Sequence, residues 1–188
     1  VPLGTGILVD AAGADTYDAR YGAMGFGDTV SVGTFLEHAG DDVYLEDGRL
    51  IAALLGHGRE LGAGVFADFL GDDSYRAANG SAGVGNGNGA GLFLDMAGTD
   101  EHVALSTNTW GFAAGQFEQD TDPRRALPTY GLFIDSGAGE DTYTRIDLED
   151  DDPPLVGNGL TWTQRADQDS TVELGVGIDG DGLTGYEP

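Results

Sequence analysis

Short apolar runs recur along this chain, and each run ends in an acidic residue followed by a turn that contains glycine. The first copy spans residues 6–17, and further copies begin near residues 33, 64, 91, 131 and 175. Each run is rich in Val, Ile, Leu and Phe and is bounded by Gly and Asp, which predicts a buried strand entering a tight turn. The copies are therefore repeats of one structural unit.

The spacing of the copies restricts the architecture. The first four copies start 27 or 31 residues apart, and glycine-dense stretches between them, such as 83–89, suit further short strands packed close to a neighbouring backbone. This period is too short for a four-stranded propeller blade of about 40–50 residues. We therefore predict an all-β fold, a parallel β-solenoid of about six coils. Its stacked coils bury a ladder of apolar side chains: Leu8, Phe35, Phe66, Phe93 and Phe133.

The whole chain, residues 1–188, is predicted to form one repeat domain. The last two periods are longer because they contain residues 116–128 and 146–155, which we interpret as loop insertions that protrude from the coils. Residues 160–174 alternate like a strand but lack the repeat motif. We expect this segment to cap the last coil and to block edge pairing there.

The charge balance excludes several classes of partner. Acidic residues number 33 against 8 basic residues, all of them Arg, so the formal charge is −25 and nucleic acid or an anionic membrane is repelled. The longest apolar run, residues 50–55, is far shorter than the ~20 residues that span a bilayer. There is no Cys and hence no disulfide or thiolate chemistry. This composition favours an extracellular, cell-surface or high-salt setting.

Stacking the repeats aligns acidic residues in two rows, which we call the strand-end row and the turn row. The strand-end row comprises Asp10, Glu37, Asp68, Asp95 and Asp135. The turn row comprises Asp15, Asp42, Asp73, Asp100 and Asp141. Two unit charges 4.8 Å apart repel by about 3.5 kcal/mol at an effective dielectric constant of 20, so the rows need neutralisation. Carboxylate oxygens on Gly-rich turns suit bound Ca²⁺. The alternative is that these side chains cap turns and are solvated by water and sodium.

One segment carries a family resemblance. Ser136-Gly137-Ala138-Gly139-Glu140-Asp141-Thr142-Tyr143-Thr144 is similar to the calcium-binding nonapeptide repeat of RTX proteins, with Ser in place of the first Gly. Residues 40–44 and 71–75 match its second half. The resemblance implies a right-handed parallel β-roll that holds Ca²⁺ between successive turns, secretion, and folding triggered by the ion. It also implies that the turn row and nearby turn carbonyls supply the ligands.

The C-terminal region holds a second calcium motif. Asp179-Gly180-Asp181-Gly182 is similar to the calcium loops of thrombospondin type 3 and EF-hand motifs. Gly177 stands where those loops begin with an acid, and Pro188 stands where their final Glu falls. Asp179 and Asp181 are the candidate ligands.

Two features suggest a carbohydrate-related alternative. Asp41 and Asp42 precede a Gly56-His57-Gly58 segment, an order that resembles polygalacturonases, which are β-helices with paired aspartates as acid and base. The chain lacks the Asn-Thr-Asp and Arg-x-Lys elements of that pattern. Trp110 and Trp162, with Tyr21 and Tyr130, form either a sugar-stacking platform or parts of the core and cap.

We therefore expect a non-catalytic, calcium-stabilised β-solenoid module of a secreted or cell-surface protein. It would serve as a structural spacer, an adhesion element or an assembly element. A carbohydrate-binding or carbohydrate-active β-helix is the alternative. The expected partners are divalent cations, with polysaccharide or further copies of the same chain as candidates.

Overall fold

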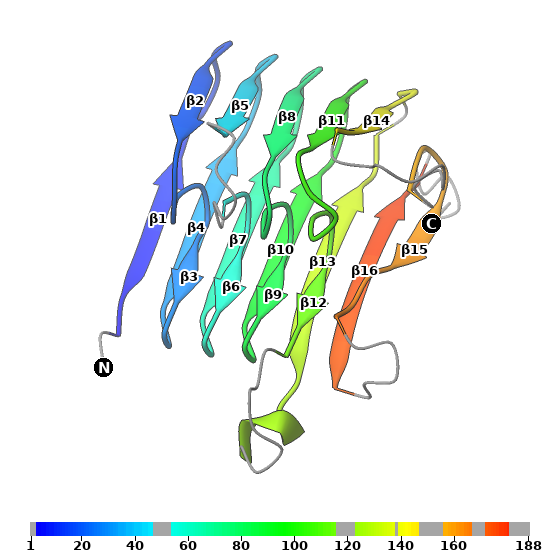
Figure 1. The fold of residues 1–188 in the computed structure, drawn as a ribbon. Coiled ribbons are helices and arrows are strands. Elements are labelled where there is room, and N and C mark those ends of the chain that lie inside the picture. The colour runs from blue at the N-terminus through cyan, green and yellow to red at the C-terminus, as the bar shows by residue number, and fades with distance from the viewer. Residues whose placement is uncertain are drawn as a thin grey trace, which may run out of the picture.

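The structure is a computed structural model that describes residues 3–46, 54–115, 123–137, 139–146, 156–166 and 172–180. In these ranges the secondary structure consists of strands and one short 3₁₀ helix, η1 (Pro123–Ala126). The strands form three sheets that run side by side along the molecule (Figure 1). The predicted all-β fold with parallel sheets is confirmed.

The first sheet is the largest, and its strands lie in the order β1-β4-β7-β10-β13-β16-β15. Their bounds are β1 (Thr5–Val9), β4 (Val32–Glu37), β7 (Ala63–Asp68), β10 (Ala90–Asp95), β13 (Thr129–Asp135), β15 (Thr161–Thr163) and β16 (Glu173–Asp179). The second sheet contains β2 (Thr16–Ala19), β5 (Val43–Glu46), β8 (Ser74–Ala77), β11 (Glu101–Ala104) and β14 (Thr142–Arg145). The third contains β3 (Gly27–Asp28), β6 (Gly58–Arg59), β9 (Gly85–Asn86) and β12 (Ala113–Ala114).

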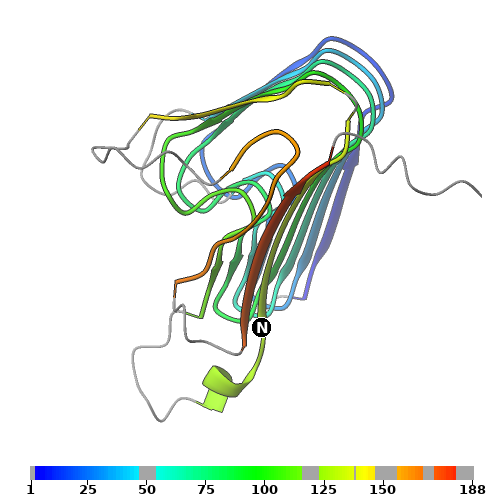
Figure 2. The same cartoon turned by 90° about the vertical axis from the view of Figure 1, so that its right-hand side faces the viewer.

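The chain passes through the three sheets in turn and then repeats the path one strand further along. Strands β4, β5 and β6 thus pair in parallel with β7, β8 and β9. We call each such pass a rung, and seen along the stack the rungs follow nearly the same outline (Figure 2). Equivalent repeat positions face each other in register, as with Phe66 and Phe93. Equivalent positions of the sequence copies therefore lie opposite each other on neighbouring strands.

Two aromatic ladders fill the interior. Phe35, Phe66, Phe93 and Phe133 stack with ring centroids 4.7–5.3 Å apart, and their side chains are at most 2 % exposed. A second ladder stacks at 4.7–5.1 Å and consists of Tyr17, Tyr44, Tyr75, His102 and Tyr143. The predicted phenylalanine row is thus buried. Its first member, Leu8, is 49 % exposed because β1 is the edge strand.

The third sheet packs closely against the first, and glycine makes this approach possible. Gly56 and Gly83 have φ of 79° and 74°, and a Cβ atom there would lie 1.9–2.0 Å from the carbonyl oxygens of Leu92 and Leu132. No other residue type fits such a contact. The prediction that the glycine-dense stretches pack against a neighbouring backbone is correct.

The C-terminal end of the first sheet is closed by β15, which pairs antiparallel with β16. Trp162 on β15 turns inward and packs against Phe133, with ring centroids 5.7 Å apart and ring planes tilted by 39°. It occupies the space that a side chain at Gly177 would need. Within the predicted cap of residues 160–174, residues 161–163 form this antiparallel strand, whereas residues 173–174 already belong to β16, which continues the parallel sheet. Of the predicted insertions, residues 116–122 and 147–155 lie outside the described residues, while 123–126 form η1.

Candidate metal centre

Both acidic rows lie at the corner where the first sheet turns into the second. The strand-end row closes the strands of the first sheet and the turn row precedes the strands of the second. From the second rung onward these carboxylates point inward. Exposed fractions are 0–3 % for Glu37, Asp68, Asp95, Asp135 and Asp179, and 1–9 % for Asp42, Asp73, Asp100 and Asp141. Bulk water therefore does not reach these side chains, and neutralisation by sodium or ordered water stays an alternative.

The turn row is ordered by backbone hydrogen bonds between rungs. The backbone N–H of Asp42 donates to the carboxylate of Asp73 at 2.6 Å, and that of Asp73 donates to Asp100 at 2.7 Å. Asp15 and Asp100 donate in the same way to the turn aspartate of the following rung. The turn-capping part of the alternative is therefore correct, and it satisfies one oxygen of each accepting carboxylate.

The strand-end row receives its hydrogen bonds from the aromatic ladder. The Tyr44 hydroxyl donates to Asp68 at 2.6 Å, and the Tyr75 hydroxyl donates to Asp95 at 2.6 Å. In the next rung His102 takes the tyrosine position, and its Nε2 lies 2.8 Å from Asp135. Burial raises the pKa of Tyr44 and Tyr75, so both remain protonated donors. Sequence reasoning missed this partnership, although the tyrosine recurs in the repeat.

The two rows converge into three carboxylate triads, which are Asp42, Asp68 and Asp73; Asp73, Asp95 and Asp100; and Asp100, Asp135 and Asp141. In each triad one oxygen from every residue lies within 4.8 Å of the others. Asp73 and Asp100 each belong to two triads, so the three sites form a continuous chain. This combination of one strand-end and two turn aspartates did not follow from reading the rows separately.

Each of the first two triads also contains buried oxygens without a hydrogen-bond partner. Asp42 and Asp68 have one such atom each in the first triad, and Asp95 and Asp100 have one each in the second. An unpartnered buried carboxylate oxygen costs free energy because water can no longer solvate it. A bound cation, a proton or an ordered water molecule can each supply the missing partner of these atoms.

Burial of the triad aspartates also shifts their pKa values upward. Burial, followed by repulsion from neighbouring aspartates, raises the pKa of Asp73 from 3.8 to about 8 although its bond from Asp42 opposes the shift. Burial likewise raises the pKa of Asp100 to about 7, and that of Asp95 well above its usual range. In the absence of a bound cation the triads therefore retain protons near neutral pH.

For protein stripped of divalent cations, we expect the melting temperature to fall as the pH rises from about 4 to about 8. Asp73 and Asp100 bind protons more tightly in the folded state than in the unfolded state. Their contribution is complete below the unfolded pKa of 3.8 and is lost as the pH passes about 7 to 8. Thermal denaturation in chelator-treated, metal-free buffers measures this. A melting temperature that rises between pH 5 and 8 contradicts it.

The structure brings together seven of the predicted ligands: Asp42, Asp68, Asp73, Asp95, Asp100, Asp135 and Asp141. Among the described residues, Asp10, Asp15, Glu37 and Asp179 belong to no such triad. Asp10 and Asp15 lie in the half-exposed edge rung, while Asp179 is in register with Asp135 and extends the strand-end row. Asp181 lies outside the described residues, so the loop motif that includes Asp179 stays a prediction.

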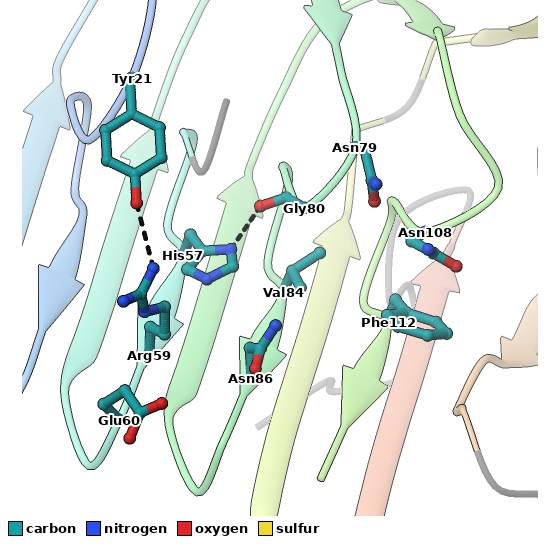
Figure 3. Close-up of a pocket in the computed structure, with 10 residues that line it drawn as sticks. All are labelled: Tyr21, His57, Arg59, Glu60, Asn79, Gly80, Val84, Asn86, Asn108 and Phe112. Carbon is teal, nitrogen blue, oxygen red and sulfur yellow. Dashed lines mark hydrogen bonds between the residues drawn. The ribbon is translucent and has the colours of Figure 1, made fainter. Parts of the chain in front are cut away.

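A separate polar pocket of about 360 Å³ lies on the outer surface beside the third sheet (Figure 3). Its lining includes Tyr21, Arg59 and Asn86, with Phe112 at one end. His57 also lines it; burial lowers its pKa to about 4, so the ring is neutral, and its Nδ1 donates to the Gly80 carbonyl. Pockets that bind small ligands combine aromatic side chains with a few polar groups such as Asn amides. The polysaccharide alternative stays a prediction, and this pocket is where it can be tested.

The residues that suggested a carbohydrate site do not lie together in the structure. Asp42 is buried in the first triad, and neither it nor the exposed Asp41 is among the described residues that line the His57 pocket. Trp110 and Trp162 are 1 % and 5 % exposed, so they fill the core and the cap. The predicted acid pair beside His57 and the tryptophan platform are both wrong.

Comparison of the chain with protein-family models, with curated proteins and with solved structures gives no match. Over the described residues, no helix has the length and apolar character needed to cross a membrane. The chain is therefore described by its own fold and site. It is an all-β chain of parallel sheets with buried aspartate triads that could hold a metal ion.

Proposed function

We propose that this chain is a right-handed parallel β-solenoid stabilised by Ca²⁺, and that it serves as a non-catalytic module of a secreted or cell-surface protein. The order of strands supports the solenoid, because each sheet takes every third strand of the repeat. The module acts as a rigid spacer, adhesion element or assembly element. Six coils of about 4.8 Å give it a length of about 25–30 Å.

One observation carries the metal proposal: buried carboxylates from neighbouring rungs meet in triads and keep oxygens without partners. If the triads were empty and ionised, neighbouring charges would repel by several kcal/mol. A divalent cation removes the repulsion and supplies the missing partner at once. Because Asp73 and Asp100 each contact two sites, bound ions connect the rungs along the stack.

The donor set favours calcium among the divalent cations. All three ligands of each triad are aspartates, and hard oxygen donors suit Ca²⁺ and Mg²⁺ over Zn²⁺ or copper. Mg²⁺ usually retains several waters, whereas these side chains are at most 9 % exposed. Calcium accepts more protein oxygens at longer distances, and turn carbonyls are the expected further ligands. An extracellular setting supplies the ion.

The same burial supports a structural role over a catalytic one. A catalytic carboxylate must reach substrate, but the triad aspartates face the interior of the stack. Their hydrogen bonds run to the backbone of the preceding rung and to the aromatic ladder. A cation bound at such a site therefore holds one rung against the next.

Replacing Asp73 by Asn tests the proposal against a neighbour in the sequence. Asp73 is 3 % exposed and shared by two triads, whereas Asp72 is exposed and accepts a hydrogen bond from the Thr99 N–H at 2.9 Å. Asp73→Asn and Asp72→Asn each remove one negative charge. We expect Asp73→Asn to weaken calcium binding at least tenfold in calorimetric titration, and Asp72→Asn to change it less than twofold.

The effect of Asp73→Asn on the melting temperature should change sign between chelator and saturating Ca²⁺. In chelator above pH 8, where Asp73 is ionised, Asp73→Asn removes a buried charge and should melt at or above the temperature of the parent protein. In saturating Ca²⁺ it should melt below the parent. Equal loss of affinity in both variants would mean that calcium is only a diffuse counterion on an acidic surface, and the triad sites would be rejected.

A further inference from the structure

The outer face of the first sheet is mostly apolar, and its strands carry no charged residue there. Side chains point outward at every second position of its strands, and the in-register rows contain no acidic or basic residue, although 22 % of the chain is charged. The central row is Ile7, Thr34, Val65, Leu92, Leu132 and Val176. The flanking rows are Thr5, Val32, Ala63, Ala90, Tyr130 and Leu174, and Val9, Leu36, Ala67, Leu94, Ile134 and Ile178.

Such a face is unusual for a strand exposed to water. A half-exposed strand alternates apolar and polar residues, whereas continuous apolar runs are typical of parallel strands covered on both faces. Here Leu92, Phe93 and Leu94 form one such run, of which only Phe93 faces the interior. Large contiguous apolar patches on soluble proteins mark interaction sites.

The face is uneven in shape. A hollow of about 320 Å³ lies over the small residues Ala63 and Ala90. Beside it in the same row stand two large side chains, Tyr130 and Leu174, which are 46 % and 50 % exposed. The face therefore presents a recess and a ridge of apolar side chains next to each other.

We propose that this face binds the same face of a second copy of the chain, forming a two-fold symmetric dimer. A two-fold axis along the strands, between β10 and β13, places Tyr130 of each copy over Ala90 of the other and Leu174 over Ala63. The same operation pairs Ala67 with Ile178, so large side chains again meet a small one. The face is complementary to itself, which a two-fold interface requires.

The dimensions suit a reversible dimer. Overlap from β4 to β15 spans six strands, which at about 4.8 Å per strand is about 29 Å, and the three outward rows cover about 17 Å. Two such faces bury about 1,000 Å² together, at the lower limit for a specific interface. We therefore expect a dissociation constant in the micromolar range. Thr34, Thr161 and Thr163 provide a polar rim.

The net charge of the chain predicts how dimerisation depends on salt concentration. Each copy carries a formal charge of −25, so two copies repel at long range. Salt screens this repulsion and leaves the apolar contact intact. We therefore expect dimerisation to strengthen as NaCl rises, opposite to association driven by complementary charges.

Sedimentation velocity over a concentration series, in Ca²⁺ and in chelator, tests the proposal. Leu92→Glu places a charge at the centre of the face and should yield only monomer. Val103→Glu makes the same change on β11 of the second sheet and should leave the dimer unaffected. Circular dichroism verifies that both variants keep the fold. A parent protein that is monomeric through the high micromolar range in 0.5 M NaCl overturns the proposal, and the face then belongs to a different partner.

A swap of residues tests the placement of the axis. Ala90→Tyr should fill the hollow and weaken the dimer at least tenfold, and Tyr130→Ala should weaken it by removing the ridge. The double variant exchanges ridge and hollow and should regain most of the parent affinity. If the double variant is weaker than both single variants, this packing is wrong. The proposal does not depend on the metal sites, because a dimer in chelator is expected as well as in Ca²⁺.

Discussion

Adding saturating Ca²⁺ to the chelator-treated protein is expected to raise its melting temperature by about 10 °C or more. A ligand that binds only the folded state stabilises it by about 4 kcal/mol per site at one thousand times its dissociation constant. For a chain of this size each kcal/mol shifts the melting temperature by about 2–4 °C. One occupied triad thus gives the expected shift, and further occupied triads increase it.

The preparation and the controls decide how this result is interpreted. Because the triad aspartates are buried, the protein should be unfolded in chelator and refolded without metal before the comparison. Mg²⁺ and additional NaCl at matched ionic strength serve as controls and should produce a much smaller shift. Equal melting temperatures in Ca²⁺ and in chelator would falsify the calcium proposal.

Much of the architecture could be predicted because the repeat is written directly in the sequence. The run that contains Phe66 aligns with the run that contains Phe93, and the structure pairs these residues in register. Parallel stacking of equal units brings equal positions together, so the aromatic ladder and both acidic rows followed from the alignment alone. The glycine positions likewise predicted close backbone contact.

The alignment of the repeats did not show whether the side chains of the acidic rows point inward or outward. Asp95 was predicted only to end a strand, with no direction for its side chain. A period of two along the strand places Asp95 on the same face as Phe93, and the structure confirms that both are buried. That periodicity was the available signal. The triads themselves depend on the angle between two sheets, which no local pattern specifies.

The contact between β15 and β16 is a second feature that the sequence alone could not predict. Gly177 occupies the position of Phe133 in the last strand, which on sequence alone indicates a degenerate repeat. In the structure Trp162 arrives from the antiparallel strand β15 and takes the place of the missing ring. A substitution that is compensated by a residue far away in the repeat pattern becomes visible only once the strands are placed.

Replacing Phe66 by Asp is expected to abolish cooperative folding. Phe66 is fully buried and stacks between Phe35 at 5.3 Å and Phe93 at 5.1 Å. Removing the ring costs about 3–5 kcal/mol, and burying an unpaired carboxylate costs several more, while the entire stability of a domain is about 5–15 kcal/mol. The new charge also faces the same interior as Asp68, so it adds to an existing repulsion.

The adjacent residue supplies the matched control, since Val65→Asp changes the outward side of the same strand. It should keep the fold and alter the free energy of unfolding by about 1 kcal/mol, because a charge there is solvated in the monomer. Circular dichroism spectra and thermal denaturation of the two variants give the comparison. If Phe66→Asp keeps the sheet signal and the melting temperature of the parent, the phenylalanine ladder does not form the interior. If Val65→Asp fails to fold, the outer face is already covered within a single chain, and it has no surface to offer a second copy.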